Sequence, residues 1–269
     1  MKTIIEPGMT SRRYWRDLWH YRELIYFLAW RDVAVRYKQT AIGIIWALLR
    51  PGVTMLVFVG FRRLAHFPTS AVPEPLLVFA AVLPWQFFST ALAEASDSLI
   101  SNANLLTKVY FPRLVIPGAA VVTSLVDFCI TLGLLAVLMV WYGFMPGWQV
   151  VLLPAVVVMS FALSLGLGLF LAALNVEYRD FRYVVPFIVQ FGMFISPVAF
   201  STAEVPEQWR TLYSLNPLVG IIDGFRWSLL GGDALPPGTL WISTVMTVLM
   251  MLLGIWYFRR MEHGFADVI

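Results

Sequence analysis

The sequence predicts an all-α integral membrane protein with six membrane-spanning helices, on the strength of three observations. Hydrophobic residues make up 59% of the 269 residues, charged residues make up 13%, and the mean hydropathy is +0.76, which is more apolar surface than a soluble domain buries. The apolar stretches are continuous over about 17 to 27 residues, the length of membrane-spanning helices rather than of the alternating segments of a β-barrel. Basic residues are unevenly divided between alternate loops, as in other helical membrane proteins.

The first element, residues 1–38, is predicted to be a cytoplasmic N-terminal arm with an amphipathic helix at the membrane interface. One side of its helical wheel is apolar: Trp15, Leu18, Trp19, Tyr21, Ile25 and Tyr26. The other side is charged or polar, with Arg22 as the exception: Arg13, Arg16, Asp17, His20 and Glu23. Such a helix suits the headgroup region, with Trp at the interface and Arg toward anionic lipid. A soluble amphipathic helix docked on a partner is the alternative.

Six apolar runs between charge clusters predict the spans of one transmembrane domain, residues 39–269. They lie at about 39–61, 76–94, 115–141, 149–174, 184–200 and 240–258. With the N-terminus in the cytoplasm, fourteen of the nineteen basic residues lie on the cytoplasmic side, four lie in external loops, and Arg50 lies within a span. The positive-inside rule therefore places both termini in the cytoplasm.

Span four, at about 149–174, carries small residues at close helical spacing. Ser160, Ser164 and Gly168 repeat every four residues, and Gly166 lies beside them. Small residues at this spacing let two helix backbones approach closely, so the pattern predicts tight packing rather than chemistry.

The region between spans five and six, residues 201–239, is predicted to form a structured cap on the external side. Its apolar segment, 218–230, has thirteen residues and is interrupted by Asp223 and Arg226. It is too short to cross the bilayer and predicts a re-entrant or interfacial helix. Pro197 has no N–H to donate, so span five should break near its outer end, where the cap begins.

Several function classes find no support in the motifs of the chain. No G-x-x-x-x-G-K-[ST] motif is present, so ATP hydrolysis is expected on another chain. The three histidines are dispersed and no hydrolase signature lies in a span, which argues against an enzyme. One cysteine excludes a cysteine metal cluster, and no metal site is expected.

Two ionisable residues fall at comparable depth inside predicted spans, Arg50 in the first and Asp127 in the third. An isolated charge at that depth costs at least ~2.5 kcal/mol, which leads to the hypothesis that the two form an ion pair. The alternative is that each snorkels to the interface or lines an aqueous cavity separately.

Aromatic residues inside the spans are candidates for lining a passage. Phe187, Phe191 and Phe194 share one face of span five. Four further candidates lie in spans one and two: Trp46, Trp85, Phe87 and Phe88. Rings of this kind could slide against the apolar C–H faces of sugars, and contact with lipid is the alternative.

Four stretches together resemble the permease subunits of ABC-2-type polysaccharide exporters, which serve O-antigen, capsule and teichoic acid. They are RDVAVRYKQTAIGIIWALLRP (31–51), NLLTKVYFPRLVIP (104–117), NVEYRDFRYVVPFIVQFGMFISPVAF (175–200) and NPLVGIIDGFR (216–226). The resemblance implies a homodimeric channel in the bacterial inner membrane, with two copies of a separate ATPase beneath it. ATP and Mg²⁺ would bind that ATPase, and no cofactor is expected on this chain. The cargo would be a lipid-linked glycan. Membrane lipid would surround the channel, and no nucleic acid partner is expected.

The resemblance also implies roles for individual positions. The loop 95–114 would form the coupling helix on the ATPase, through Asn104, Leu105, Lys108, Phe111, Pro112 and Arg113. The external gate would include Asn216, Pro217, Asp223 and Arg226. Spans one and five would flank the channel. An ABC-2 permease for a small hydrophobic drug or lipid and an integral-membrane transferase are the alternative functions.

Overall fold

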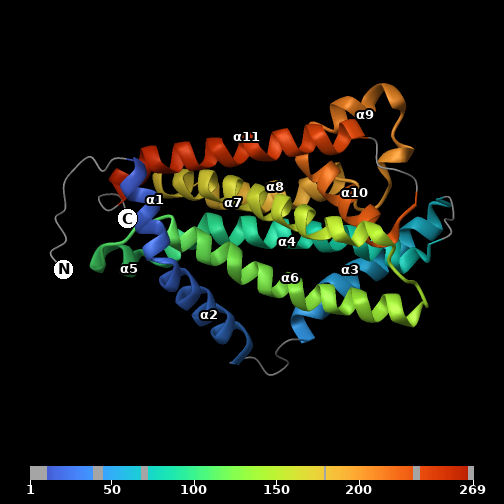
Figure 1. Ribbon diagram of the computed structural model, residues 1–269, viewed down its shortest axis with the longest axis horizontal. Coiled ribbons are helices and arrows are strands. Elements are labelled where there is room, and N and C mark those ends of the chain that lie inside the picture. Colours follow the sequence, from blue (N-terminus) through green and yellow to red (C-terminus); the bar gives the residue numbers. More distant parts are fainter. Residues whose placement is uncertain (1–10, 39–44, 68–71, 179, 233–236, 266–269) are drawn as a thin grey trace.

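The computed structural model describes residues 11–38, 45–67, 72–178, 180–232 and 237–265, which fold into helices joined by short turns, without a strand among them (Figure 1). Four long helices run along the long axis of the molecule: α4 (Glu74–Ser101), α6 (Val115–Trp141), α7 (Leu153–Glu177) and α11 (Pro237–Met261). The all-α prediction is therefore confirmed for the described residues.

Helix α4 forms the centre of the molecule. Its most apolar 18-residue stretch is 78% buried, whereas the corresponding stretches of α6 and α7 are 33% buried. It contacts α6, α7, α10 (Pro217–Leu230) and α3 (Ile45–Leu64). A helix that is apolar on all sides suits such a position, since neighbouring helices cover each of its faces.

Within the described residues, five helices are long and apolar enough to cross a membrane, and they correspond to predicted spans one, two, three, four and six. They are Ile45–Leu64, Glu74–Ser101, Val115–Trp141, Trp148–Glu177 and Gly238–Gly264. The fourth combines α7 with a preceding 3-10 turn, η1 (Trp148–Leu152). The first six residues of predicted span one, 39–44, lie outside the described residues.

The predicted fifth span, 184–200, is shorter in the structure. Helix α8 (Phe181–Ile195) has 15 residues and ends before Ser196, whose φ of −98° and ψ of 153° are extended. A residue that precedes proline is sterically driven out of the helical region, and Pro197 offers no N–H to continue the ladder. The predicted break is confirmed, but it comes five residues before the expected end of the span.

The N-terminal arm contains two helices instead of the single amphipathic helix expected from the wheel. Helix α1 (Ser11–His20) ends in a turn at Tyr21, and α2 (Arg22–Lys38) continues from there. Leu18, Tyr21 and Ile25 pack against buried residues, whereas the side chains of Trp15 and Trp19 are exposed. Part of the predicted apolar face therefore serves packing within the chain.

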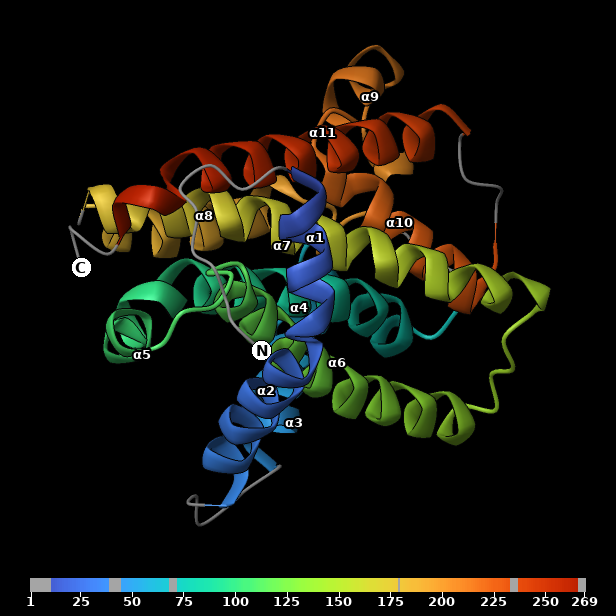
Figure 2. The ribbon, with the colours of Figure 1, turned by 60° about the vertical axis from the view of Figure 1, so that its left-hand side comes forward.

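The two ends of the helix bundle carry different elements (Figure 1). Helices α1 and α5 (Ala103–Lys108) lie at one end with η3 (Glu262–Gly264), and we call this the α5 end. Helices α9 (Glu207–Tyr213) and α10 lie at the other, which we call the α10 end. Figure 2 shows α2 and α3 projecting together from the side of the bundle.

Helices α7 and α11 approach each other at two glycines, which confirms the packing predicted for span four. A Cβ added to Gly254 would lie 1.9 Å from the carbonyl oxygen of Gly166, and one added to Gly166 would lie 2.4 Å from Met251 Cα. Gly168 faces Ala95 of α4 in the same way, at 2.7 Å. The small side chains therefore determine the spacing of three helices.

Candidate functional site

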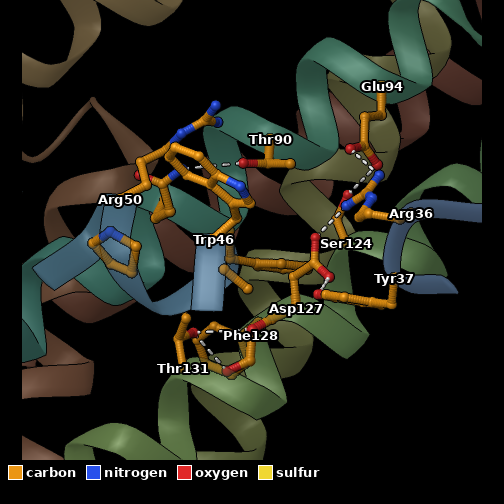
Figure 3. Close-up of a pocket in the computed structure, with 14 residues that line it drawn as sticks. Arg36, Tyr37, Trp46, Arg50, Thr90, Glu94, Ser124, Asp127, Phe128 and Thr131 are labelled. Carbon is orange, nitrogen blue, oxygen red and sulfur yellow. Dashed lines mark hydrogen bonds and ion pairs between the residues drawn. The ribbon is translucent and has the colours of Figure 1, made fainter. Parts of the chain in front are cut away.

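A polar pocket of about 450 Å³ lies where the end of α2 and the start of α3 meet α4 and α6 (Figure 3). Its walls combine charged, hydroxyl and aromatic side chains. The residues that carry polar or aromatic side chains there are Arg36, Tyr37, Trp46, Arg50, Gln86, Phe87, Thr90, Glu94, Ser124, Asp127, Phe128 and Thr131. This volume falls in the range of small-molecule binding sites.

One side of the pocket is an ionic network centred on Arg36. Its guanidinium donates to the carboxylates of Glu94 on α4 and Asp127 on α6. The Tyr37 hydroxyl donates to the second oxygen of Asp127, and the Ser124 hydroxyl donates to Glu94 at 2.8 Å. The C-terminal end of α2 is thereby tied to two long helices. Burial and the Asp127 carboxylate raise the pKa of Tyr37, which keeps its hydroxyl a proton donor.

Asp127 therefore pairs with a different arginine from the one expected. Arg50 lines the same pocket, but no residue in the described part of the chain forms an ion pair with it, and Trp46 separates it from Asp127 in the view of Figure 3. Equal depth along two spans does not specify which helix lies nearest, and α2 packs along α6 beside Asp127. Glu94, at the end of predicted span two, was missed. Its carboxylate in an apolar run was the available signal.

A double-mutant cycle distinguishes these two pairings. Arg36→Gln combined with Asp127→Asn should show a coupling of about 1 kcal/mol in the free energy of unfolding, a modest value because both side chains are partly exposed. The same cycle for Arg50 and Asp127 should give a coupling near zero. Unfolding in detergent micelles without added lipid measures both, and a larger coupling for Arg50 would contradict the network.

At the α5 end, Glu262 joins three separate parts of the chain. Its Oε1 accepts the backbone N–H of Arg113 at 2.9 Å and the Tyr14 hydroxyl at 3.3 Å. The Arg113 guanidinium donates to the Glu262 carbonyl oxygen and lies 5.9 Å from the centre of the Phe265 ring. The segment between α5 and α6 is thus fastened to the C-terminal end of α11 and to α1.

Replacing Glu262 tests whether this junction holds the three segments together. Glu262→Ala removes the acceptor of two donors and should lower the free energy of unfolding by about 2 kcal/mol, whereas Glu262→Gln keeps a carbonyl oxygen and should cost less than about 1 kcal/mol. The exposed neighbour His263 supplies the control, His263→Ala, which should be close to neutral. Equal losses for the two Glu262 variants would argue against the junction.

At the α10 end, two buried arginines hold the chain that follows the break of α8. The Arg226 guanidinium donates to the carbonyl oxygens of Val198 and Phe200, both at 2.9 Å, and its Nε donates to that of Leu77 at 3.3 Å. Arg62, from the end of α3, donates to the Ala199 carbonyl at 2.8 Å. Burial lowers the pKa of Arg226 to about 10, so it is still charged at neutral pH.

The remaining predicted gate residues lie around this clamp. Asp223, buried on α10, lies 3.8 Å from Arg226. The Asn216 side chain caps α10 by accepting the N–H of Leu218 at 3.1 Å, and its amide donates to the Ser196 hydroxyl at 3.3 Å. Pro217 occupies the first turn, where its missing N–H costs nothing. The structure thus brings all four predicted gate residues to one end, together with Arg62, one of the four basic residues that the sequence places in external loops.

Comparison with known proteins identifies the family of this chain. The ABC-2 type transporter family matches residues 23–230, from the start of α2 to the end of α10. The chain belongs to the ABC-2 type transporter family. It is a multi-pass membrane protein, as the five long apolar helices indicate.

Relatives of this ABC-2 transporter chain are export permeases for bacterial polysaccharides. It is 34% identical over 214 residues to the O-antigen export system permease protein RfbA of Myxococcus xanthus, covering 78% of this chain and 82% of the relative. Over 241 residues it is 22% identical to the polysialic acid transport protein KpsM of Escherichia coli, covering 87% and 92%. The capsule polysaccharide export inner-membrane protein CtrC of Neisseria meningitidis is 23% identical over 253 residues, covering 90% and 92%.

The residues expected to couple this ABC-2 chain to an ATPase divide into two groups. Asn104 and Lys108 lie exposed on α5, beside exposed Val109 and Tyr110, while Leu105 is partly buried there. Phe111 is buried, Pro112 is partly buried and Arg113 bonds to Glu262. Only the first group offers a free surface.

The aromatic candidates for a passage also divide by burial. Trp46 on α3 is 56% exposed, and Phe187, Phe191 and Phe194 are exposed on α8. Trp85, Phe87 and Phe88 are each 3% exposed, because α4 lies at the centre of the bundle. Trp85 packs against Gly192 and Phe87 against Phe128. Burial within the chain does not agree with lining a passage for these three, although Phe87 contributes to the pocket wall.

Proposed function

We propose that this chain is the channel-forming permease subunit of an exporter that moves a lipid-linked polysaccharide, of O-antigen or capsule type, across the bacterial inner membrane. Two copies would form the channel, and two copies of a separate ATPase would supply ATP hydrolysis. The observation that carries the proposal is the match to polysaccharide export permeases over 82% to 92% of their own lengths. The absence of a nucleotide-binding motif in the sequence is consistent with a separate ATPase.

The proposal includes six membrane crossings with both termini in the cytoplasm. Helix α8, with 15 residues, is about 22 Å long and by itself falls short of the hydrocarbon core of about 30 Å. Residues 196–200, which form turns and bends, would complete the crossing, since the carbonyl groups of Val198, Ala199 and Phe200 accept from Arg62 and Arg226 inside the protein. An even number of crossings is consistent with α1 and η3 lying together at the α5 end (Figure 1).

The α5 end would then face the cytoplasm and the ATPase. Helix α5 presents Lys108 and the adjacent Tyr110 as exposed side chains, and Phe111 and Arg113 would support this surface from inside. The passage would run beside α3 and α8, where Trp46 and the three phenylalanines of α8 are exposed. The α10 end, with its buried clamp, would form the external gate.

The test of this function is export itself. The test host is a strain without an O-antigen export permease. It should regain surface polysaccharide when it expresses this chain together with the partner ATPase and the enzymes that make the cargo. The chain without the ATPase should leave the polysaccharide inside the cell. Transport of a small hydrophobic drug with no effect on surface polysaccharide would instead support a different cargo, and transferase activity of the purified chain alone would overturn the proposal.

Replacing the exposed residues of the coupling surface should uncouple the two subunits without unfolding this one. Lys108→Ala and Tyr110→Ala together should weaken binding of the ATPase by about thirtyfold, because truncating a central interface residue costs more than about 1 kcal/mol and the two costs add to about 2 kcal/mol. Trp209→Ala, an equally exposed truncation at the α10 end, is the matched control and should leave ATPase binding unchanged. Co-purification of the two subunits at graded concentrations measures the effect. Unchanged binding in the double variant would remove α5 from the interface.

A further inference from the structure

The pocket beside α2 contains two separated charges of opposite sign. Arg36 is shared by Glu94 and Asp127, so this group of three carries one net negative charge. Arg50 carries one positive charge and has no ion-pair partner among the residues that the structure describes. The Arg36 network and Arg50 occupy different walls of the pocket (Figure 3). A ligand with one charge of each sign would complement both.

The wall around Arg50 is built from hydrogen-bond donors. Trp46 offers its indole N–H, and Figure 3 shows it together with Arg50 and Thr90 on the same side of the pocket. The Gln86 amide donates to the Thr90 hydroxyl at 3.3 Å, which leaves the hydroxyl proton of Thr90 free to point toward a ligand. A guanidinium with neighbouring donors is suited to a phosphate group, whose oxygens accept two parallel N–H bonds.

The opposite wall has acceptor capacity left over. Asp127 accepts one bond at each of its oxygens, from Arg36 and Tyr37, and Glu94 likewise accepts from Arg36 and Ser124. A carboxylate has about four lone-pair sites, so each can accept a further N–H donor. The net negative charge of the network favours an ammonium group there.

The surface beside the pocket is apolar. Along α3, Leu49, Val53 and Val57 are exposed on the same helix as Trp46 and Arg50. In a membrane such a surface contacts hydrocarbon chains, so a headgroup in the pocket could keep its acyl chains against α3. A free small molecule would not use this surface.

We propose that this pocket binds the zwitterionic headgroup of a phosphatidylethanolamine-type lipid, with its phosphate on Arg50 and its ammonium on Asp127 and Glu94. The volume of about 450 Å³ is large enough for a phosphoethanolamine group. Pairing would also relieve the cost of an isolated arginine charge within a span. The bound lipid would join α2 and α3 to the core of the bundle.

Lipid retention by the purified chain tests the proposal without the ATPase or any cargo. The chain is prepared in detergent with equal amounts of phosphatidylethanolamine, phosphatidylglycerol and diacylglycerol, and the retained lipid is counted by native mass spectrometry. Phosphatidylethanolamine should be retained at least about tenfold more strongly than either other lipid. Each of the others lacks one charged contact, and the loss of one charge-assisted hydrogen bond weakens binding by about that much. Arg50→Gln and Asp127→Asn should each abolish most of this preference, and Arg50→Lys should keep part of it.

Arg63→Gln is the matched control, because Arg63 lies on the same helix, pairs with Glu74 and does not line the pocket. It should retain phosphatidylethanolamine like the wild type. Equal retention of phosphatidylglycerol would overturn the ammonium site, and equal retention of diacylglycerol would overturn the phosphate site. Displacement by soluble glycerophosphoethanolamine at the lipid's own concentration would assign the pocket to a free metabolite rather than a lipid. If Arg50→Gln fails to fold, unchanged selectivity in Arg50→Lys and Asp127→Asn together would still overturn the proposal.

Discussion

Gly254→Ala should lower the free energy of unfolding by about 3 kcal/mol, because the added methyl group has no space between α7 and α11. Its Cβ would lie 1.9 Å from the Gly166 carbonyl oxygen, a backbone atom that cannot rotate away. The two helices would have to separate along their length, which would also disturb the contact of Gly166 with Met251. Loss of close packing is especially damaging in a membrane, where van der Waals contact is a main force between helices.

Gly133→Ala on α6 is the control for this substitution. It makes the same chemical change within a long helix, but nothing lies within 4 Å of the added Cβ. Alanine has the higher helix propensity, so this variant should be neutral or slightly more stable. Thermal unfolding of both variants in the same detergent gives the comparison. Equal stability of the two variants would show that α7 and α11 do not approach as closely as the structure has them.

Arg226→Met, at the α10 end, should lower the free energy of unfolding by a comparable amount, about 4 kcal/mol. The substitution leaves the carbonyl oxygens of Leu77, Val198 and Phe200 without their donor and leaves Asp223 without its nearby positive charge. Arg226→Lys should recover only part of the loss, because one ammonium group cannot reach three carbonyl oxygens that a planar guanidinium serves.

The control for the arginine clamp is Arg63→Gln, which breaks the exposed pair of Arg63 with Glu74. Exposed pairs contribute about 1 kcal/mol or less, so this variant should be nearly as stable as the wild type. Hydrogen exchange adds a local measurement, since amides of residues 196–204 should lose protection in Arg226→Met before those of α7 do. Uniform protection across both segments in that variant would show that Arg226 does not hold the chain after α8.

The regularities of the bilayer explain why the helices could be predicted. Hydrocarbon requires each spanning segment to satisfy its own backbone hydrogen bonds, so length and hydropathy were sufficient to find α4, α6, α7 and α11. The break before Pro197 also followed from local chemistry, because proline restricts its own backbone and that of its neighbour. No local sequence signal marked the turn at Tyr21, where the single helix predicted for the N-terminal arm is divided into α1 and α2. Residues of both helices pack onto the bundle.

Helix rotation and neighbours explain where the predicted site differs from the structure. Asp127 was recognised as a charge that needs a partner, but Arg36 reaches it from a helix outside the predicted spans. Trp85 and Phe88 are aromatic residues of the kind expected to line a passage, but α4 places them in the centre of the chain. Phe111 and Arg113 lie shortly after α5, but Phe111 is buried and Arg113 contacts Glu262 and Phe265, which follow α11.

Local composition and rules that apply segment by segment were enough to predict the membrane environment, the helical class and most of the long apolar helices. The partners of the charges were decided only by the tertiary structure. Arg36 with Glu94 and Asp127, Arg226 with the chain after α8, and Arg113 with Glu262 join positions 26 to 149 residues apart. Which side chains meet over such separations depends on how whole helices rotate and pack, and one sequence does not encode that in any local pattern.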